Sequence, residues 1–252
     1  MHGLLETVPS IVGLSAPQRV VKFWGGKTDF VEGNCCAPGG YKNINGPHSI
    51  EANMEHVYAD PSNYDWPMIA KCWSENWSNA NPYAEIRLQK TPADVFRVPM
   101  VSAHFHDLKW IVSVRNPYAY VESIMRKATF QMEPLRQLDQ VCFHVLRTLE
   151  IQIQNAAFLG TDAYVMTYED FVARPEHHRA QMAAWLPGLE YMDFDAELII
   201  KGQKVAAIAD DSPAKVQRMI AEIPDIIPMI NEYFSPCESL LNHWGYELMK
   251  VH

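Results

Sequence analysis

A cation stands at the start of a predicted helix in the segment KWIVSVRNPYAYVES, residues 109–123. Residues 109–114 form an apolar, β-prone run, Arg115 follows, and Asn116-Pro117 is a typical helix start with a capping side chain and a proline. A helix N-terminus carries partial positive charge, which favours anions and disfavours cations. A bound anion would be attracted by both the free N–H groups and Arg115, and Ser123 would add a hydroxyl donor. The alternative is an Arg115 that pairs with a carboxylate of the protein.

A second cation, Lys90, ends another apolar run at residues 85–90. Thr91-Pro92 follows it as the cap and first position of a helix. Ligands of open α/β sheets bind beyond the carboxyl ends of the strands, so Lys90 and Arg115 are expected at the same edge. Lys90 is therefore a candidate for stabilising negative charge, and the alternative is an ordinary solvent-exposed lysine.

The elements that must position these side chains are apolar runs separated by helical segments. Such runs occur at residues 19–24, 85–90, 109–114 and 163–168. A further helix is predicted from Pro175 to the Pro187-Gly188 pair. Continuous apolar strands that alternate with helices predict an α/β fold, a three-layer sandwich in which helices cover both faces of a parallel central sheet. We expect a single domain over residues 1–252.

Residues 42–84 differ from this pattern because they are rich in Asn, Pro, Tyr and Trp. A helix from about Asp65 would place four apolar side chains on one side, Trp66, Ile69, Trp73 and Trp77. We favour a helix that packs into the core, and the alternative is the wall of a substrate site.

Composition excludes several classes of protein. With 48% hydrophobic and 20% charged residues, the chain has the composition of a soluble globular protein. Its net charge of −9 argues against nucleic acid as a partner and against a heavily sulfated or phosphorylated polymer as substrate. Any anion site must therefore be local.

The sequence also bears on location. No run of about 18 apolar residues occurs, so no membrane span is expected, and the first residues lack the basic region of a signal peptide. The five cysteines are an odd number without CxxC spacing, which favours free thiols and a cytoplasmic location. No cluster of His, Cys and carboxylates has the spacing of zinc ligands.

Motifs at the predicted strand ends resemble those of one family. VRNPYAYVES, in which Ser123 comes eight positions after Arg115, is similar to the 3′-phosphate-binding motif of sulfotransferases that use 3′-phosphoadenosine 5′-phosphosulfate. LQKTPADVFRVP resembles the family's acid-Lys-Thr-Pro segment, YVMTYEDFVARPE its Tyr-Glu-Asp strand end, and HWGYEL its closing Gly-Tyr segment. The resemblance spans residues 20–248 and implies the P-loop NTPase-like sulfotransferase fold.

One family element has no counterpart, the Ser/Thr/Gly-rich loop that binds the 5′-phosphosulfate. The GGKT segment suggests a Walker A motif, but that motif needs glycine at position 21, which is Val21, and a helix after the threonine. We expect that the chain starts just past the loop, that the first strand is absent, and that residues 1–14 are the end of a helix that stops at Pro9.

The resemblance implies roles for four residues. Arg115 and Ser123 would bind the 3′-phosphate of the cosubstrate 3′-phosphoadenosine 5′-phosphosulfate, and Lys90 would stabilise the transferred group. Glu32 is the candidate general base, with Asp29 as second choice and an ordinary loop carboxylate as the alternative. No metal is required.

The implied reaction is transfer of a sulfuryl group to a hydroxyl of a carbohydrate or small metabolite, with residues 42–84 on the acceptor side. The alternative is a non-catalytic relative that kept the fold and acts as a binding or scaffold protein. A P-loop protein of the kinase type is disfavoured by the failed Walker A match. Neither the acceptor nor the oligomeric state is specified by the sequence.

Overall fold

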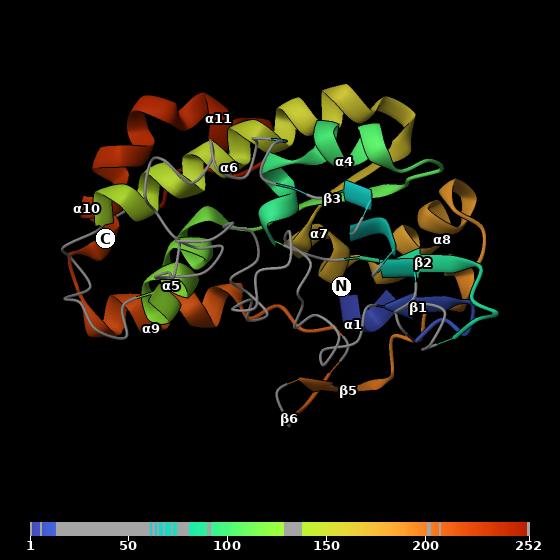
Figure 1. Ribbon diagram of the computed structural model, residues 1–252. Helices are drawn as coiled ribbons and strands as arrows, with labels where there is room; N and C mark the ends of the chain where they lie inside the picture. The colour runs from blue at the N-terminus through green and yellow to red at the C-terminus, as the bar shows by residue number, and fades with distance from the viewer. Residues whose placement is uncertain are drawn as a thin grey trace. The chain divides into compact units, whose positions relative to one another are not determined.

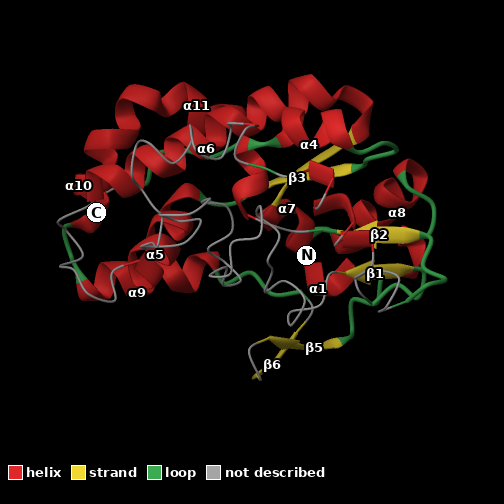
Figure 2. Ribbon diagram, in the orientation of Figure 1, coloured by secondary structure: helices red, strands yellow, loops and turns green. Residues whose placement is uncertain are grey.

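The computed structural model describes residues 2–5, 7–13, 61, 64, 66–67, 69–71, 73–74, 81–89, 92–128, 138–200, 203–206 and 208–250. Its strands form two parallel pairs and one antiparallel pair among helices, which confirms the predicted α/β class (Figure 2). The chain divides into two compact units, which we describe separately. The first comprises Met1–Leu108 and Arg174–Ala209, and the second comprises Lys109–Ala173 and Asp210–His252. The expectation of a single domain stays a prediction.

The first unit contains a parallel strand pair, β1 (Ile11–Gly13) with β2 (Ile86–Leu88), in a register that joins Gly13 to Leu88. The strand predicted at 85–90 is confirmed by β2. The strand β1 was not predicted, because residues 1–14 were expected to be a helix that stops at Pro9. Helix α1 (His2–Leu5) ends earlier. A proline disfavours helical geometry in the residue before it, and all three residues of β1 are buried in the strand instead.

The helix predicted from Pro92 is divided in two. A 3₁₀ helix, η4 (Pro92–Phe96), precedes α4 (Val98–His104), whose second residue is a proline. The proline has no N–H to continue a ladder from η4, so the α-helix starts afresh at Val98. Arg97 lies at the junction, 1% exposed, and its Nε donates to Asp94 Oδ1 at 2.9 Å.

Aromatic side chains from residues 66–74 are buried in the first unit. The described residues in this range are helical, and the side chains of Trp66, Ile69 and Trp73 are buried. The Trp66 ring stacks on His104 with centroids 4.6 Å apart, and Trp73 stacks on Phe105 at 5.2 Å. These contacts confirm the predicted packing role for the three buried side chains. Trp77, the fourth member of the predicted face, lies outside the described residues.

The rest of the first unit, Arg174–Ala209, lies in sequence between the two segments of the second unit. Helix α8 (Pro175–Trp185) is confirmed, and Gly188 after it has a φ of 103°, a left-handed conformation that favours glycine. The 3₁₀ helix η7 (Leu189–Tyr191) and the antiparallel strands β5 (Glu197–Ile200) and β6 (Gln203–Ala206) complete this part.

The second unit is built on the parallel pair β3 (Trp110–Val114) and β4 (Ala163–Thr167), which confirms the strands predicted at 109–114 and 163–168. Helix α5 (Pro117–Ala128) follows β3, and the long helix α6 (Leu138–Leu159) packs against β3 and α5 (Figure 1). The remaining elements are η6 (Gly160–Asp162), α7 (Tyr168–Ala173), α9 (Ser212–Glu222), α10 (Ile226–Phe234), η8 (Ser235–Cys237) and α11 (Glu238–His243).

A buried carboxylate ties α5 to α9. The Glu122 side chain is 4% exposed, and its Oε1 accepts hydrogen bonds from Arg126 Nε at 2.7 Å and Arg218 Nε at 2.9 Å. Burial raises the pKa of Glu122, but the hydrogen bonds from Arg126 and Arg218 outweigh it, so the carboxyl has a lowered pKa. The charged carboxylate thus stabilises the contact between the two helices.

This ion pair makes stability depend on pH. A carboxyl whose pKa is lower in the folded state contributes stability at neutral pH, and that contribution is lost as the pH falls through the folded pKa. We expect Glu122→Gln to lower the free energy of unfolding at pH 7 by about 1.5–3 kcal/mol, the range for hydrogen bonds to charged groups. The variant should also lose less stability than the wild type below pH 4.5, the ordinary pKa of glutamate. Urea unfolding of both proteins at pH 3.5, 5 and 7 measures this, and equal losses on acidification would contradict it.

Candidate functional site

Arg115 lies where the sequence predicted it, at the carboxyl end of β3 and directly before α5. The predicted helix cap is confirmed, because Asn116 Oδ1 accepts the Ala119 N–H at 3.1 Å. Val114 pairs in register with Thr167, the last residue of β4. The residues that follow the two strands therefore start from the same edge of the pair, as in other parallel sheets.

The Arg115 guanidinium has three partners in the second unit. Its Nη2 forms an ion pair with Asp211, and its Nε donates to Ser212 Oγ at 3.0 Å. Its Cζ lies 4.7 Å from the centre of the Tyr168 ring, a cation–π contact. The structure thus places Arg115 in the alternative arrangement, paired with a carboxylate of the protein.

Asp211 is a carboxylate between two cations. It is the N-cap residue of α9, and its Oδ2 lies 2.9 Å from Lys215 Nζ, one helical turn further on. Burial raises the pKa of Asp211, but hydrogen bonds from Lys215 and Arg115 outweigh that effect and lower it. Asp211 therefore stays ionised at neutral pH and compensates positive charge at the strand edge.

A second carboxylate, Glu169, joins three segments at the same edge. Its Oε1 accepts the backbone N–H of Asn116 at 2.9 Å and the Ser212 hydroxyl at 2.7 Å. Its Oε2 accepts the Tyr246 hydroxyl at 2.7 Å. We term Glu169 and these three donors the Glu169 junction. Because Asn116 caps α5, a negative charge is already present at the N-terminus of that helix.

Tyr246 reaches the junction from a segment held by its own hydrogen bonds. The Met249 N–H donates to the Tyr118 hydroxyl at 3.0 Å, and Asn231 Nδ2 donates to the Met249 carbonyl at 2.9 Å. Burial, together with the neighbouring Glu169 carboxylate, raises the pKa of Tyr246, so its hydroxyl remains a donor. The sequence had singled out the segments around Glu169 and Tyr246 but had assigned a role to neither residue.

Ser123, the predicted hydroxyl donor, lies in the second turn of α5. Its Oγ is buried and has no hydrogen-bond partner among the residues that the structure describes. A buried hydroxyl without a partner is costly, so a ligand that bonds to it would remove that cost. The candidate residues Lys90, Glu32 and Asp29 lie outside the described residues.

The motif-bearing segments around Arg115 and Glu169 have a known counterpart. Residues 42–193, more than half of the chain, match the family model described as the sulfotransferase family. The chain is a member of the sulfotransferase family. The family predicted from the motifs is therefore confirmed, whereas no curated protein and no solved structure matched the chain.

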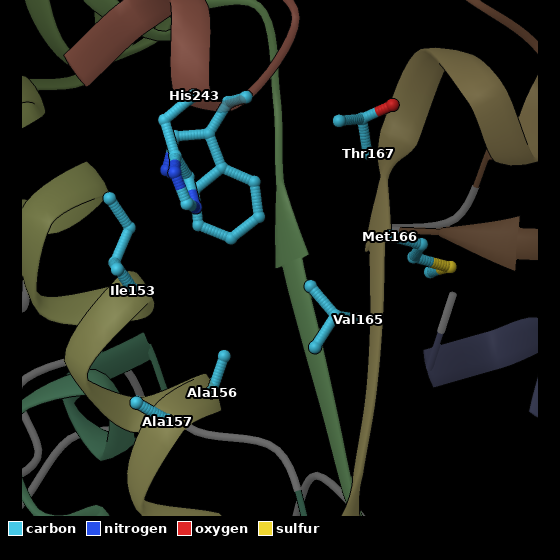
Figure 3. A pocket seen from close by; sticks show the side chains of 8 residues that line it. Ile153, Ala156, Ala157, Val165, Met166, Thr167 and His243 are labelled. Atoms are coloured by element: carbon cyan, nitrogen blue, oxygen red, sulfur yellow. The ribbon is translucent and has the colours of Figure 1, made fainter. Parts of the chain in front are cut away.

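The second unit also has an open, mostly apolar pocket of about 490 Å³ beside β4. Figure 3 shows Ile153 and Ala156 on α6 across an open space from Val165, which is 45% exposed despite its central position in the strand. The other residues that line this pocket are Ala157, Met166, Thr167, His243 and Trp244.

Two further findings concern only the part of the chain that the structure describes. Among those residues, no group of three or more His, Cys, Asp or Glu side chains is arranged to hold a metal ion. None of the helices described is both long enough and apolar enough to cross a membrane.

The Glu169 junction should carry a measurable share of the stability. Glu169→Ala removes the acceptor of three donors, and we expect the free energy of unfolding to fall by about 3 kcal/mol. Glu169→Gln keeps one acceptor oxygen and should cost about half as much. Urea unfolding measures both.

The matched control for this test is Glu150→Ala on α6. Glu150 pairs with Arg147 at the surface, and its loss should change stability by less than about 0.5 kcal/mol. If Glu169→Ala were no more destabilising than Glu150→Ala, the junction would have no structural role.

Proposed function

We propose that this member of the family transfers a sulfuryl group from 3′-phosphoadenosine 5′-phosphosulfate to a hydroxyl of a carbohydrate or small metabolite. The observation that carries the proposal is the family match over residues 42–193, which includes Arg115 and Ser123. The geometry supports it in a second way: a cation at a strand end precedes a capped helix of 12 residues, an arrangement suited to phosphate.

In the proposed complex, Arg115 and Ser123 bind the 3′-phosphate. The guanidinium offers N–H donors in a plane, a geometry that matches the oxygens of a phosphate. Its Nε bond to Ser212 and its stacking on Tyr168 fix its position before the nucleotide arrives. Ser123 would supply the hydroxyl that lacks a partner among the described residues.

Catalysis is assigned to Lys90 and Glu32. Glu32 would accept the proton of the acceptor hydroxyl as the acceptor oxygen bonds to sulfur. The bond between sulfur and the bridging phosphate oxygen breaks, and that oxygen leaves as part of 3′-phosphoadenosine 5′-phosphate. Lys90 would stabilise the negative charge that develops on it.

The acceptor side is proposed to include residues 42–84. Trp66, Ile69 and Trp73 are already used in packing, so aromatic contacts with an acceptor would have to come from other residues of this segment. A cytoplasmic location is proposed from the odd number of cysteines without CxxC spacing.

A second candidate function is that of a non-catalytic family member that binds or organises partners. The ion pair between Arg115 and Asp211 favours this non-catalytic candidate, because Arg115, the proposed phosphate ligand, already has an anionic partner. The two candidates differ in whether the chain binds 3′-phosphoadenosine 5′-phosphate and turns over its phosphosulfate form.

Nucleotide binding tests the proposed phosphate site. Arg115→Ala should weaken binding of 3′-phosphoadenosine 5′-phosphate by at least about 1.5 kcal/mol, the scale of a lost charge-assisted hydrogen bond. Isothermal titration calorimetry measures it. Arg147→Ala is the control, because Arg147 pairs with Glu150 within α6. This variant should bind the nucleotide with the affinity of the wild type. Equal affinity of the Arg115→Ala variant and the wild type would count against the site.

Turnover tests the two catalytic assignments. Glu32→Gln and Lys90→Ala should each lower the rate of sulfuryl transfer by about 100-fold or more, the contribution of a general base or of a charge-stabilising group. The release of 3′-phosphoadenosine 5′-phosphate in the presence of a panel of hydroxyl acceptors provides the assay. Asp29→Asn tests the second choice for the base, and a loss in this variant but not in Glu32→Gln would assign the role to Asp29. A wild type that binds the nucleotide but transfers to none of the acceptors would favour the non-catalytic candidate.

A further inference from the structure

The contacts of Arg115 are of two kinds. Nε bonds to Ser212 Oγ, which in turn donates to Glu169 at 2.7 Å, and the guanidinium face stacks on Tyr168. These contacts anchor the arginine to the Glu169 junction. The remaining contact, from Nη2 to Asp211, involves a side chain that is 53% exposed. An exposed ion pair of this type is weak and exchanges readily.

Asp211 has a second cationic partner besides Arg115. Its second carboxylate oxygen already binds Lys215 Nζ at 2.9 Å, because Asp211 caps α9 and Lys215 lies one helical turn further on. If an incoming anion took the Nη2 group of Arg115, the Asp211 carboxylate would still be paired with Lys215. Displacement would therefore leave no unpaired charge on the protein.

We infer that Asp211 competes with the 3′-phosphate of the nucleotide for Arg115 and so sets the affinity and selectivity of the site. This inference rests on the proposed function. A phosphate with nearly two negative charges and three acceptor oxygens displaces a carboxylate from a guanidinium. A singly charged anion gains no more from Arg115 than Asp211 already provides. Asp211 thus makes the site selective for a doubly charged group, and Lys215 holds the displaced carboxylate.

The first test removes the competitor. Asp211→Asn should bind 3′-phosphoadenosine 5′-phosphate about two- to fivefold more tightly than the wild type, the range expected from the loss of one exposed ion pair. Calorimetry measures the affinity. Unchanged or weaker binding would overturn the inference, since weaker binding would mean that Asp211 orients Arg115 for the nucleotide.

The matched control is Asp225→Asn. Asp225 is the N-cap residue of α10, with a φ of −90° and a ψ of 10° against −99° and 5° for Asp211. Both changes remove one negative charge from a helix start, so tighter binding by both variants would indicate a general charge effect and overturn the inference. Thermal unfolding checks that each variant is folded, and Asp211→Ala provides a second variant with the same expected gain.

The second test concerns Lys215. Lys215→Met should weaken nucleotide binding about two- to fivefold in the wild-type background, because displaced Asp211 then lacks its alternative partner. The same change should have no effect in the Asp211→Asn background. A loss of equal size in both backgrounds would mean that Lys215 contacts the nucleotide itself and would overturn its assigned role.

Arg115→Ala separates the two levels of the argument. If this variant binds the nucleotide as the wild type does, the proposed phosphate site is wrong. If it binds more weakly while Asp211→Asn is unchanged, the site is supported and only the competition by Asp211 is wrong. In the Arg115→Ala background, Asp211→Asn should give no gain in affinity.

Discussion

The carboxylate of Glu169 is the point at which the second unit is joined. Its three donors come from the start of α5, the start of α9 and the segment after α11. Each donor would be costly to leave without a partner in a partly buried position, so the carboxylate stabilises the close approach of the three segments. The position of Arg115 follows from this, because the arginine is bonded to Ser212, one of the three donors.

The charges at this strand edge are balanced by the protein. A cation beside the positive end of a helix is unfavourable by itself, and the sequence alone left open what compensates it. The structure contains two compensating carboxylates, Glu169 at the N-terminus of α5 and Asp211 on the guanidinium. Lys215, which pairs with Asp211, adds a second cation, so two positive and two negative side chains offset one another at this edge of a chain whose net charge is −9.

Features encoded by neighbouring residues were predictable. The strands β2, β3 and β4 and the helix starts at Asn116-Pro117 and Pro175 follow from local apolar runs, caps and prolines. The family followed from the order of short motifs. The partners of Arg115 were not predictable, because Asp211 and Ser212 are 96 and 97 residues away and no local pattern links them.

Two local predictions also failed for physical reasons. The strand β1 has only three residues, too few for an alternating or continuous pattern to stand out from a helix signal. The helix predicted to start at Pro92 is interrupted, because Pro99, two residues after Arg97, starts a new helix. The first case depends on tertiary packing, which fixes burial where propensity is ambiguous, and the second follows from a proline visible in the sequence.

The spacing of the Glu169 partners along the chain has a consequence for biosynthesis. Asn116, Ser212 and Tyr246 lie 53, 43 and 77 residues from Glu169. Residue 246 must therefore leave the ribosome before the hydrogen bond between Tyr246 and Glu169 can form. Until then, β3, β4 and α5 are present in the nascent chain without one of the three donors at this edge. Contacts of such long range also slow folding, so this strand edge is expected to form after the helical packing around α6.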